Sequence, residues 1–527
     1  MAIGDQFPVI MILAPMFGAI LVILLGIRYP KQSLPVTLVT MGLSLFAAVM
    51  TCVRVLNEGV QTYLLSGWER LPERLGGLSV GIEYRIDAFN GIVLVVIMAV
   101  AFLNAIYSKV RVARELPDKV SQFYFLYLLL VAGLAGMTIT NDAFNLYVLL
   151  EISSLTSYAL IAIGSKRAAL SAFNYVIMGT IGASFYLLGV GYLYIKTGTL
   201  NMTDIQSFMT TTSQLDSPSI QVAFMLIVIG LWVKMAFFPL HGWMPNAYAY
   251  APTATGSLMA PLVTKVMIYI MIRMMITVFG VDYVFSTLNW TDVVVNLSAV
   301  AIVAGSFFAL SRSDLRKMLT YLIVAEVGYM VGGAWMANYD GMVGAIYHIV
   351  SDAMMTLCLF FAIGIIITRT GEHRLVAFRG LFRKMPKTMI GFTVGAFSMI
   401  GLPPTCGFFS KWYLVSGGIE AGQWAYVGAL IFSSLVNAVI FFRLIEMAYF
   451  HGAHAHGEPV DDGDHHHRLG HDPDATPEDV EDRVPRSMMV PLYVAAASLI
   501  VIGLFNRVIT GWIGQALQAL NLAGGPN

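Results

Sequence analysis

Residues 387–411 read KTMIGFTVGAFSMIGLPPTCGFFSK, an apolar run of membrane-spanning length that contains its own interruption. The double proline at Pro403 and Pro404 falls inside the run, where proline removes a backbone donor and clashes with the preceding helical turn. Lys411 follows the interruption. Because unwound backbone at membrane depth is tolerated only where protein or water meets it, this stretch predicts a broken spanning helix beside a polar path.

A second apolar run is also interrupted by a proline and has a lysine beside the interruption. Residues 232–245 read WVKMAFFPLHGWMP, so an apolar run ends at Pro239 with Lys234 just before it and His241 just after it. Two broken helices, each with a lysine beside the break, are a signature of membrane transporters whose sites lie at interrupted helices.

The composition of the whole chain is that of a membrane protein. Hydrophobic residues make up 57% of its 527 residues and charged residues only 12%, against roughly 25% charged in an ordinary soluble domain. The zero net charge argues against a nucleic-acid-binding protein, and three cysteines are too few for a disulfide framework. Fourteen apolar runs are long enough for spanning helices, and no β-barrel alternation is present, so we expect an all-α polytopic membrane protein. The runs are 8–27, 34–56, 86–108, 121–140, 143–164, 168–196, 218–239, 254–280, 290–311, 316–337, 341–368, 387–411, 423–447 and 487–506.

The loops that these fourteen spans define differ in positive charge. Twenty of the 31 Lys and Arg residues lie in the loops of one side, and six lie on the other side. The positive-inside rule places the richer side in the cytoplasm, so both termini are expected on the outer side.

The two interrupted runs lie five spans apart, which suggests an internal repeat. We expect two inverted five-helix units, spans 4–8 and spans 9–13, with spans 7 and 12 broken. The expected regions are 1–120 for spans 1–3, 121–280 for the first unit, 290–447 for the second unit, 448–486 for a polar loop, and 487–527 for the last span and tail.

Five ionisable residues inside the spans form a candidate proton path: Glu151, Lys234, Lys265, His348 and Lys411. A charge in the bilayer core costs on the order of 3 kcal/mol on insertion scales, so this many are expected only along a polar path. A Glu–Lys pair that opens and closes acts as a proton switch, since the closed pair keeps the lysine charged and the open pair releases its proton. The alternative is a set of structural ion pairs between helices.

Four further ionisable residues are secondary candidates. His241 follows the first break, and Glu326 in span 10 is the counterpart of Glu151 in span 5. Arg443 in span 13 is the counterpart of Lys265 in span 8. Asp352 lies one helical turn after His348, so we expect the two side chains to be able to touch.

Motifs for cofactors and metals are missing from the sequence. It holds no CxxC, P-loop, HExxH or dinucleotide-binding glycine motif, so we expect no cofactor and no metal site. The loop at 448–486 carries seven of the ten histidines and almost no apolar residues. We expect a solvated cytoplasmic linker there; metal binding is the alternative, although the histidine spacing matches no defined zinc site.

Four of these segments resemble the motifs of one known family. They are FNLYVLLEI at 144–152, the lysine and proline segment at 233–245, the segment at 251–266 that contains Lys265, and the broken segment at 401–411. The chain is therefore similar, over about residues 85–510, to the antiporter-like membrane subunits shared by respiratory complex I, membrane-bound hydrogenases and Mrp-type cation/proton antiporters. Within that family, residues 247–253 and 410–412 are most similar to the D-type subunit of Mrp antiporters.

The resemblance implies a role for each residue of the path. Glu151 and Lys234 would be the coupled pair, Lys265 the bridging lysine, His348 the central relay and Lys411 the terminal proton donor. Two positions depart from the family pattern: Thr356 stands where many relatives have a lysine, and Glu326 stands where relatives often have an uncharged polar residue.

The resemblance also implies partners and a function. The leading hypothesis is a proton-translocating subunit of a multisubunit Na⁺ (or K⁺)/H⁺ antiporter in a bacterial inner membrane, assembled with other membrane subunits. The alternatives are a redox-driven pump of the complex I or hydrogenase type, which would make the chain a translocase subunit; the membrane arm of an inorganic-carbon uptake complex; and an autonomous transporter of an organic substrate.

Overall fold

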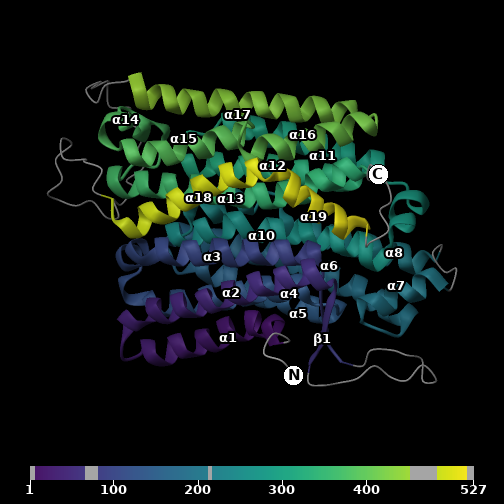
Figure 1. Ribbon diagram of the computed structural model, residues 1–527. Coiled ribbons are helices and arrows are strands. Elements are labelled where there is room, and N and C mark those ends of the chain that lie inside the picture. Colours follow the sequence, from purple (N-terminus) through teal and green to yellow (C-terminus); the bar gives the residue numbers. More distant parts are fainter. Residues whose placement is uncertain (1–5, 66–80, 212–216, 451–483, 519–527) are drawn as a thin grey trace.

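The computed structural model describes residues 6–65, 81–211, 217–450 and 484–518, and it consists almost entirely of helices that run side by side in one bundle (Figure 1). Thirteen helices in these residues are long and apolar enough to cross a membrane, which confirms the all-α polytopic fold. They are α1 (Phe7–Gly26), α2 (Ser33–Glu58), α3 (Ala88–Glu115), α4 (Val120–Ile139), α5 (Ala143–Ala162), α6 (Lys166–Thr197), α8 (Pro218–Met235), α10 (Thr253–Arg273), α11 (Thr291–Leu310), α12 (Leu315–Trp335), α13 (Tyr339–Thr370), α17 (Trp424–Phe450) and α18 (Arg486–Leu504).

Shorter elements connect these helices. One antiparallel hairpin, β1 (Gln61–Leu64) and β2 (Glu83–Ile86), precedes α3, with Gln61 opposite Ile86. The short α-helices are α7 (Met202–Thr211), α9 (Met244–Tyr250), α14 (Leu381–Lys384), α15 (Pro386–Ile400), α16 (Cys406–Glu420) and α19 (Asn506–Gln518). The 3₁₀ turns are η2 (Pro30–Gln32), η5 (Pro117–Lys119) and η8 (Leu375–Phe378), and the π-helical segments are η6 (Met274–Phe279) and η7 (Tyr283–Thr287).

The twelfth predicted span, 387–411, is not among the thirteen long helices, because it is present as two half-helices. α15 ends at Ile400 and α16 begins at Cys406, and each half is 15 residues long. Gly401 caps α15 with a φ of 94°, a left-handed conformation that glycine adopts without steric cost. The residues between the halves contain the double proline, which supplies no backbone donor to continue the helix.

The other predicted interruption is also observed. α8 ends at Met235, residues 236–243 turn away from the helix axis, and α9 begins at Met244. Ala236 caps α8 with a φ of 59°, which is uncommon for a residue that carries a Cβ. Both broken helices therefore end their first half on a residue in the left-handed region.

The two sets of five helices have matching neighbours. In the first set, α4 contacts α5, α5 contacts α6, α6 contacts α8, and α10 contacts both α4 and α8. In the second set, α11 contacts α12, α12 contacts α13, and both α13 and α17 contact the two halves of the broken helix, α15 and α16; α17 also contacts α11. Because five is an odd number of spans, the second unit enters the membrane from the opposite side, so the repeat is inverted.

The centre of the bundle lies where the two units meet. α10 of the first unit packs against α12 and α13 of the second, and these three helices are almost completely enclosed (Figure 1). The last predicted span corresponds to α18, and α19 continues after a bend at Phe505. The histidines of the predicted polar loop lie at 451–471, outside the described residues.

Candidate functional site

The predicted Glu151–Lys234 pair comes together in the first unit. The Lys234 ammonium lies 3.8 Å from Oε1 of Glu151 on α5 and donates a 2.7 Å hydrogen bond to Oγ of Ser154, one turn away on α5. Lys234 is buried, whereas 26% of the Glu151 side chain is exposed. The pair is therefore an open one, with the hydroxyl holding the ammonium while the carboxylate stands slightly apart.

The break in the first unit fixes Lys234 at this place. Lys234 lies one residue before the end of α8, and the chain turns away directly after Met235. The indole Nε1 of Trp243 donates a 3.0 Å hydrogen bond to the Val233 carbonyl, which also accepts a 3.3 Å hydrogen bond from the Ala236 N–H at the helix end. The break thus satisfies its own backbone and still presents a buried ammonium to α5.

A second ion pair joins the two units. The Lys265 ammonium on α10 lies 2.8 Å from Oδ2 of Asp352 on α13, and both side chains are buried. Thr356, one turn along α13, donates a 2.7 Å hydrogen bond to the other carboxylate oxygen of Asp352. The threonine at the position of the family's lysine therefore supports the carboxylate that binds Lys265.

The central histidine lies between an acid and a hydroxyl. His348 Nε2 contacts Oε2 of Glu326 on α12, and Nδ1 lies 2.8 Å from Oγ of Ser410 on α16. The Ser410 hydroxyl also lies 3.1 Å from the Gly407 carbonyl, and the tautomer of the imidazole ring decides which atom donates between Nδ1 and Ser410. At the contact between Nε2 and Glu326 the two groups share one proton.

Lys411 has no acidic partner of this kind. Its ammonium donates a 2.7 Å hydrogen bond to the Met399 carbonyl, lies 3.4 Å from Oγ of Ser434 on α17, and sits 5.2 Å from the centre of the Tyr329 ring. Among the described residues, no carboxylate oxygen lies within 4 Å of it. A carbonyl and an aromatic face thus take the place of a counter-ion.

Several buried polar atoms beside these groups have no hydrogen-bond partner in the described parts of the chain. They are Oε1 of Glu151, Oγ1 of Thr264, Oε1 of Glu326 and Oδ1 of Asn437. A buried polar atom without a partner is costly, and ordered water is its usual partner in a membrane protein interior as in a soluble one. These oxygens therefore keep hydrogen-bonding capacity that the neighbouring described side chains and backbone do not use.

We call the ionisable groups described above the row; they are Glu151, Lys234, Lys265, Asp352, Glu326, His348 and Lys411. Two secondary candidates, Arg443 and His241, lie outside the row. Arg443 is exposed on the outer face of α17, so it is not brought together with the buried groups as the counterpart of Lys265. His241 is half-buried in the first break, where its ring stacks on Phe238 at 5.2 Å and lies 5.9 Å from Phe308. Asp352 and His348 are one turn apart, but each is held by a different partner, Lys265 and Glu326 respectively.

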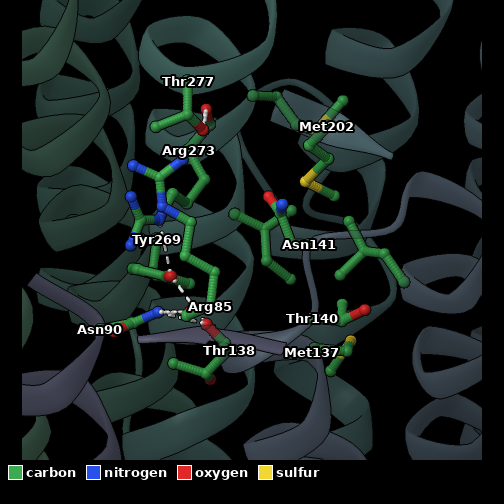
Figure 2. A pocket seen from close by; sticks show the side chains of 13 residues that line it. Arg85, Asn90, Met137, Thr138, Thr140, Asn141, Met202, Tyr269, Arg273 and Thr277 are labelled. Atoms are coloured by element: carbon green, nitrogen blue, oxygen red, sulfur yellow. Dashed lines mark hydrogen bonds between the residues drawn. The ribbon is translucent and has the colours of Figure 1, made fainter. Parts of the chain in front are cut away.

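Two polar clusters at the helix ends were not predicted. At one end, Arg273 lies 2.5 Å from Asp87 and donates to the Tyr269 hydroxyl at 2.9 Å, beside a pocket that Arg85 and Asn141 also line (Figure 2). The signal was Asp87 itself, an acid at the start of the predicted run 86–108, where it caps α3.

The other cluster surrounds Thr253, the first residue of α10. Arg111 on α3 donates to its hydroxyl at 2.5 Å, Glu115 accepts its backbone N–H at 2.8 Å, and Arg316 on α12 donates to the Ala251 carbonyl at 3.1 Å. These arginines counted only as loop charges in the sequence, yet they hold the start of α10 to both α3 and α12.

Comparisons with known proteins show which sequences and folds this chain is similar to. A sequence model of the family described as "NADH:quinone oxidoreductase/Mrp antiporter, TM" matches residues 140–437. "NADH-quinone oxidoreductase subunit N" of Desulforudis audaxviator (strain MP104C) is 40% identical and aligns over 97% of this chain and 98% of its own length. The D-type subunit of a Na(+)/H(+) antiporter from Bacillus subtilis (strain 168) is 26% identical over 98% of this chain and 97% of its own length.

Two solved structures share the fold. A chain of the membrane-bound sulfane sulfur reductase, an archaeal respiratory membrane complex, superposes with a TM-score of 0.84 and 26% identity over 97% of each chain. A chain of the Mrp complex from Dietzia sp. DQ12-45-1b superposes with a TM-score of 0.84 and 24% identity over 99% of this chain and 98% of its own length.

Proposed function

This chain belongs to the NADH:quinone oxidoreductase/Mrp antiporter transmembrane family, and from that membership we propose that it moves protons along its buried row as one subunit of a multisubunit membrane complex. The observation that carries the proposal is a set of three acid–base pairs, one within each unit and one across the enclosed junction between the units. These pairs are Glu151 with Lys234, Asp352 with Lys265, and Glu326 with His348.

Each pair has a part in the transfer. Glu151, which is partly exposed, receives a proton and weakens its hold on Lys234, so that Lys234 passes its own proton inward. Lys265 carries the charge across the junction, because it belongs to the first unit but binds Asp352 of the second. The shared proton of Glu326 and His348 moves next, and Lys411 is the last group of the row.

The orientation follows from the loops. We propose that the side rich in Lys and Arg faces the cytoplasm of a bacterial cell and that both termini face outward. The regions 1–120, 121–280, 290–447, 448–486 and 487–527 remain the proposed division of the chain.

Exchange of Na⁺ or K⁺ for H⁺ is the first candidate for the coupled process. It is supported by the Bacillus subtilis relative, whose name is that of a Na⁺/H⁺ antiporter component, and by the similarity of residues 247–253 to that type. A redox-driven pump is the second candidate, and the 40% identical relative named as a subunit of NADH-quinone oxidoreductase favours it. In either complex the other membrane subunits would supply the cation path or the electron path.

Two experiments test the proposal. The change Lys234→Ala in the assembled complex should abolish cation-dependent or substrate-dependent ΔpH in everted vesicles, because Glu151 then has no lysine to exchange protons with. Arg443→Ala is the matched control, since it removes a basic residue from the exposed face of α17, away from the row, and should leave transport unchanged. Full transport by an assembled Lys234→Ala complex would refute the row.

The subunits that co-purify through a tag on this chain separate the two candidates. Small hydrophobic partners without cofactors would establish the cation/proton antiporter. Iron–sulfur, nickel or flavin subunits would assign the same row to a redox-driven pump.

A further inference from the structure

The last span contains a third interruption. α18 ends at Leu504 and α19 begins at Asn506, with Phe505 between them at φ −93° and ψ 21°. The hinge is held from within, because Nδ2 of Asn506 donates a 2.9 Å hydrogen bond to the Gly503 carbonyl. No sequence pattern indicated it, since residues 487–506 read as one span and the following residues as a short tail.

This hinge lies directly on the break between α15 and α16. A Cβ placed on Gly503 would overlap the Pro404 carbonyl oxygen and would lie 2.8 Å from the backbone nitrogen of Cys406. Real Cβ atoms do not approach other atoms so closely, so the two backbones touch here and only glycine fits without a shift.

The hinge is also tied to α13 beside the relay histidine. The hydroxyl of Tyr347 donates a 2.9 Å hydrogen bond to the Ile502 carbonyl, one of the carbonyls near the end of α18. Tyr347 directly precedes His348 in the sequence. α13 therefore contacts the C-terminal hinge through Tyr347 and also carries His348, which shares a proton with Glu326.

The contact between Gly503 and the break holds the first turn of α16 in place. It lies against the hinge at Cys406, and against α15 at Gly407, where a Cβ would overlap the Ser398 carbonyl. The same turn leads to Ser410, which binds His348, and to Lys411. A shift of the turn would therefore move both groups relative to α13.

We propose that Gly503 and Tyr347 are positioning residues for the second unit: the C-terminal hinge holds the first turn of α16 and so sets the places of Ser410 and Lys411. The inference rests on the proposed function, and it adds a role for the C-terminal helices that the row itself does not require.

The test compares two glycine changes in the assembled complex. Gly503→Ala pushes a methyl group into the break, whereas Gly511→Ala on α19 meets no atom within 4 Å. We expect Gly503→Ala to slow transport about tenfold and to shift the pH dependence of the rate, because the contact of Ser410 with His348 changes. Gly511→Ala should alter neither quantity. Wild-type rate and pH profile in assembled Gly503→Ala would overturn the proposal.

Tyr347→Phe provides the test if Gly503→Ala prevents assembly. It removes one hydroxyl and keeps the ring, so the fold is retained. We expect the transport rate to fall about threefold and its pH dependence to shift in the same direction as in Gly503→Ala. An unchanged rate and pH profile in Tyr347→Phe would likewise overturn the proposal.

Thiol labelling separates this inference from the proposed function. Cys406 lies at the contact and is buried, as is Cys358 on α13, so a membrane-permeant maleimide should label Cys406 faster in Gly503→Ala while Cys358 stays unchanged. This readout reports the contact whether or not the chain moves protons. Faster labelling together with wild-type transport would show a contact without a positioning role and would refute the inference.

Discussion

Both broken helices place a lysine ammonium at the end of their first half, but the two lysines lie on opposite sides of the break in the sequence. In the first unit Lys234 precedes the break, and in the second unit Lys411 follows it, yet the Lys411 ammonium binds the carbonyl of Met399. Met399 holds in α15 the place that Lys234 holds in α8, one residue before the last. The repeat therefore preserves the position of an ammonium at the end of a half-helix and not the position of a lysine in the sequence.

The surroundings of the two ammonium groups differ as well. Lys234 faces a carboxylate that is 26% exposed, so the first unit has an acid in contact with the surface of the bundle. Lys411 faces a carbonyl, a serine hydroxyl and an aromatic ring, and the acid–base pair of its own unit, Glu326 with His348, is buried. The acid of the first unit is thus partly exposed, whereas the acid of the second unit is buried.

The largest effect on transport is expected at Lys411, the ammonium without a carboxylate partner. Lys411→Met removes the base at the end of the row, and we expect transport to fall by at least about 100-fold, the lower range for a positioned proton-transfer group. Lys411→Arg, which keeps a charge but cannot release a proton, should be equally inactive while the complex assembles normally. Proton flux in reconstituted vesicles measures both, and an active Lys411→Arg would show that Lys411 is only a fixed charge.

The junction between the units gives the next effect. Asp352→Asn leaves the buried Lys265 without its carboxylate, and breaking a buried pair in this way costs about 3–5 kcal/mol. We expect a lower thermal stability of the purified complex together with lost transport. The double change Asp352→Asn with Lys265→Met should restore stability but not transport; if it restores both, the pair is structural.

A smaller effect is expected at Thr356, one of the two positions that depart from the family pattern. Thr356→Val removes one hydrogen bond to Asp352 and should cost about 1 kcal/mol, with transport reduced severalfold. Thr356→Ser keeps the hydroxyl and is the matched control. Thr356→Lys places a second ammonium beside Asp352, where it competes with Lys265; an unchanged rate in this variant would show that the departure is neutral.

The sequence was sufficient for the spans and the two breaks. Apolar runs of about 20 residues define spanning helices regardless of their neighbours, and the double proline of 401–411 interrupts a helix for a local reason. The Glu151–Lys234 pair was predictable because the helices that carry it belong to the same unit and each places one charge inside an apolar span.

The remaining partners depend on how each helix is rotated, which a single sequence does not encode locally. His348 and Asp352 share a helical face in the sequence, but α12 supplies Glu326 to the first and α10 supplies Lys265 to the second. Arg443 matched Lys265 by span number, yet rotation of α17 turns it outward. The contact between Gly503 and the break is an approach of two backbones, and neither segment carries a pattern for the other.

The position of these groups along their helices has an electrical consequence. Glu151 is the ninth of 20 residues in α5, Lys265 the thirteenth of 21 in α10, and Glu326 the twelfth of 21 in α12, so all three lie near the middle of the bundle. In the proposed transfer, a proton that passes between them moves from helix to helix at nearly the same depth and crosses little of the transmembrane voltage. The voltage, worth about 2.3 kcal/mol per charge at 100 mV, therefore acts almost entirely on the steps by which a proton enters and leaves the row.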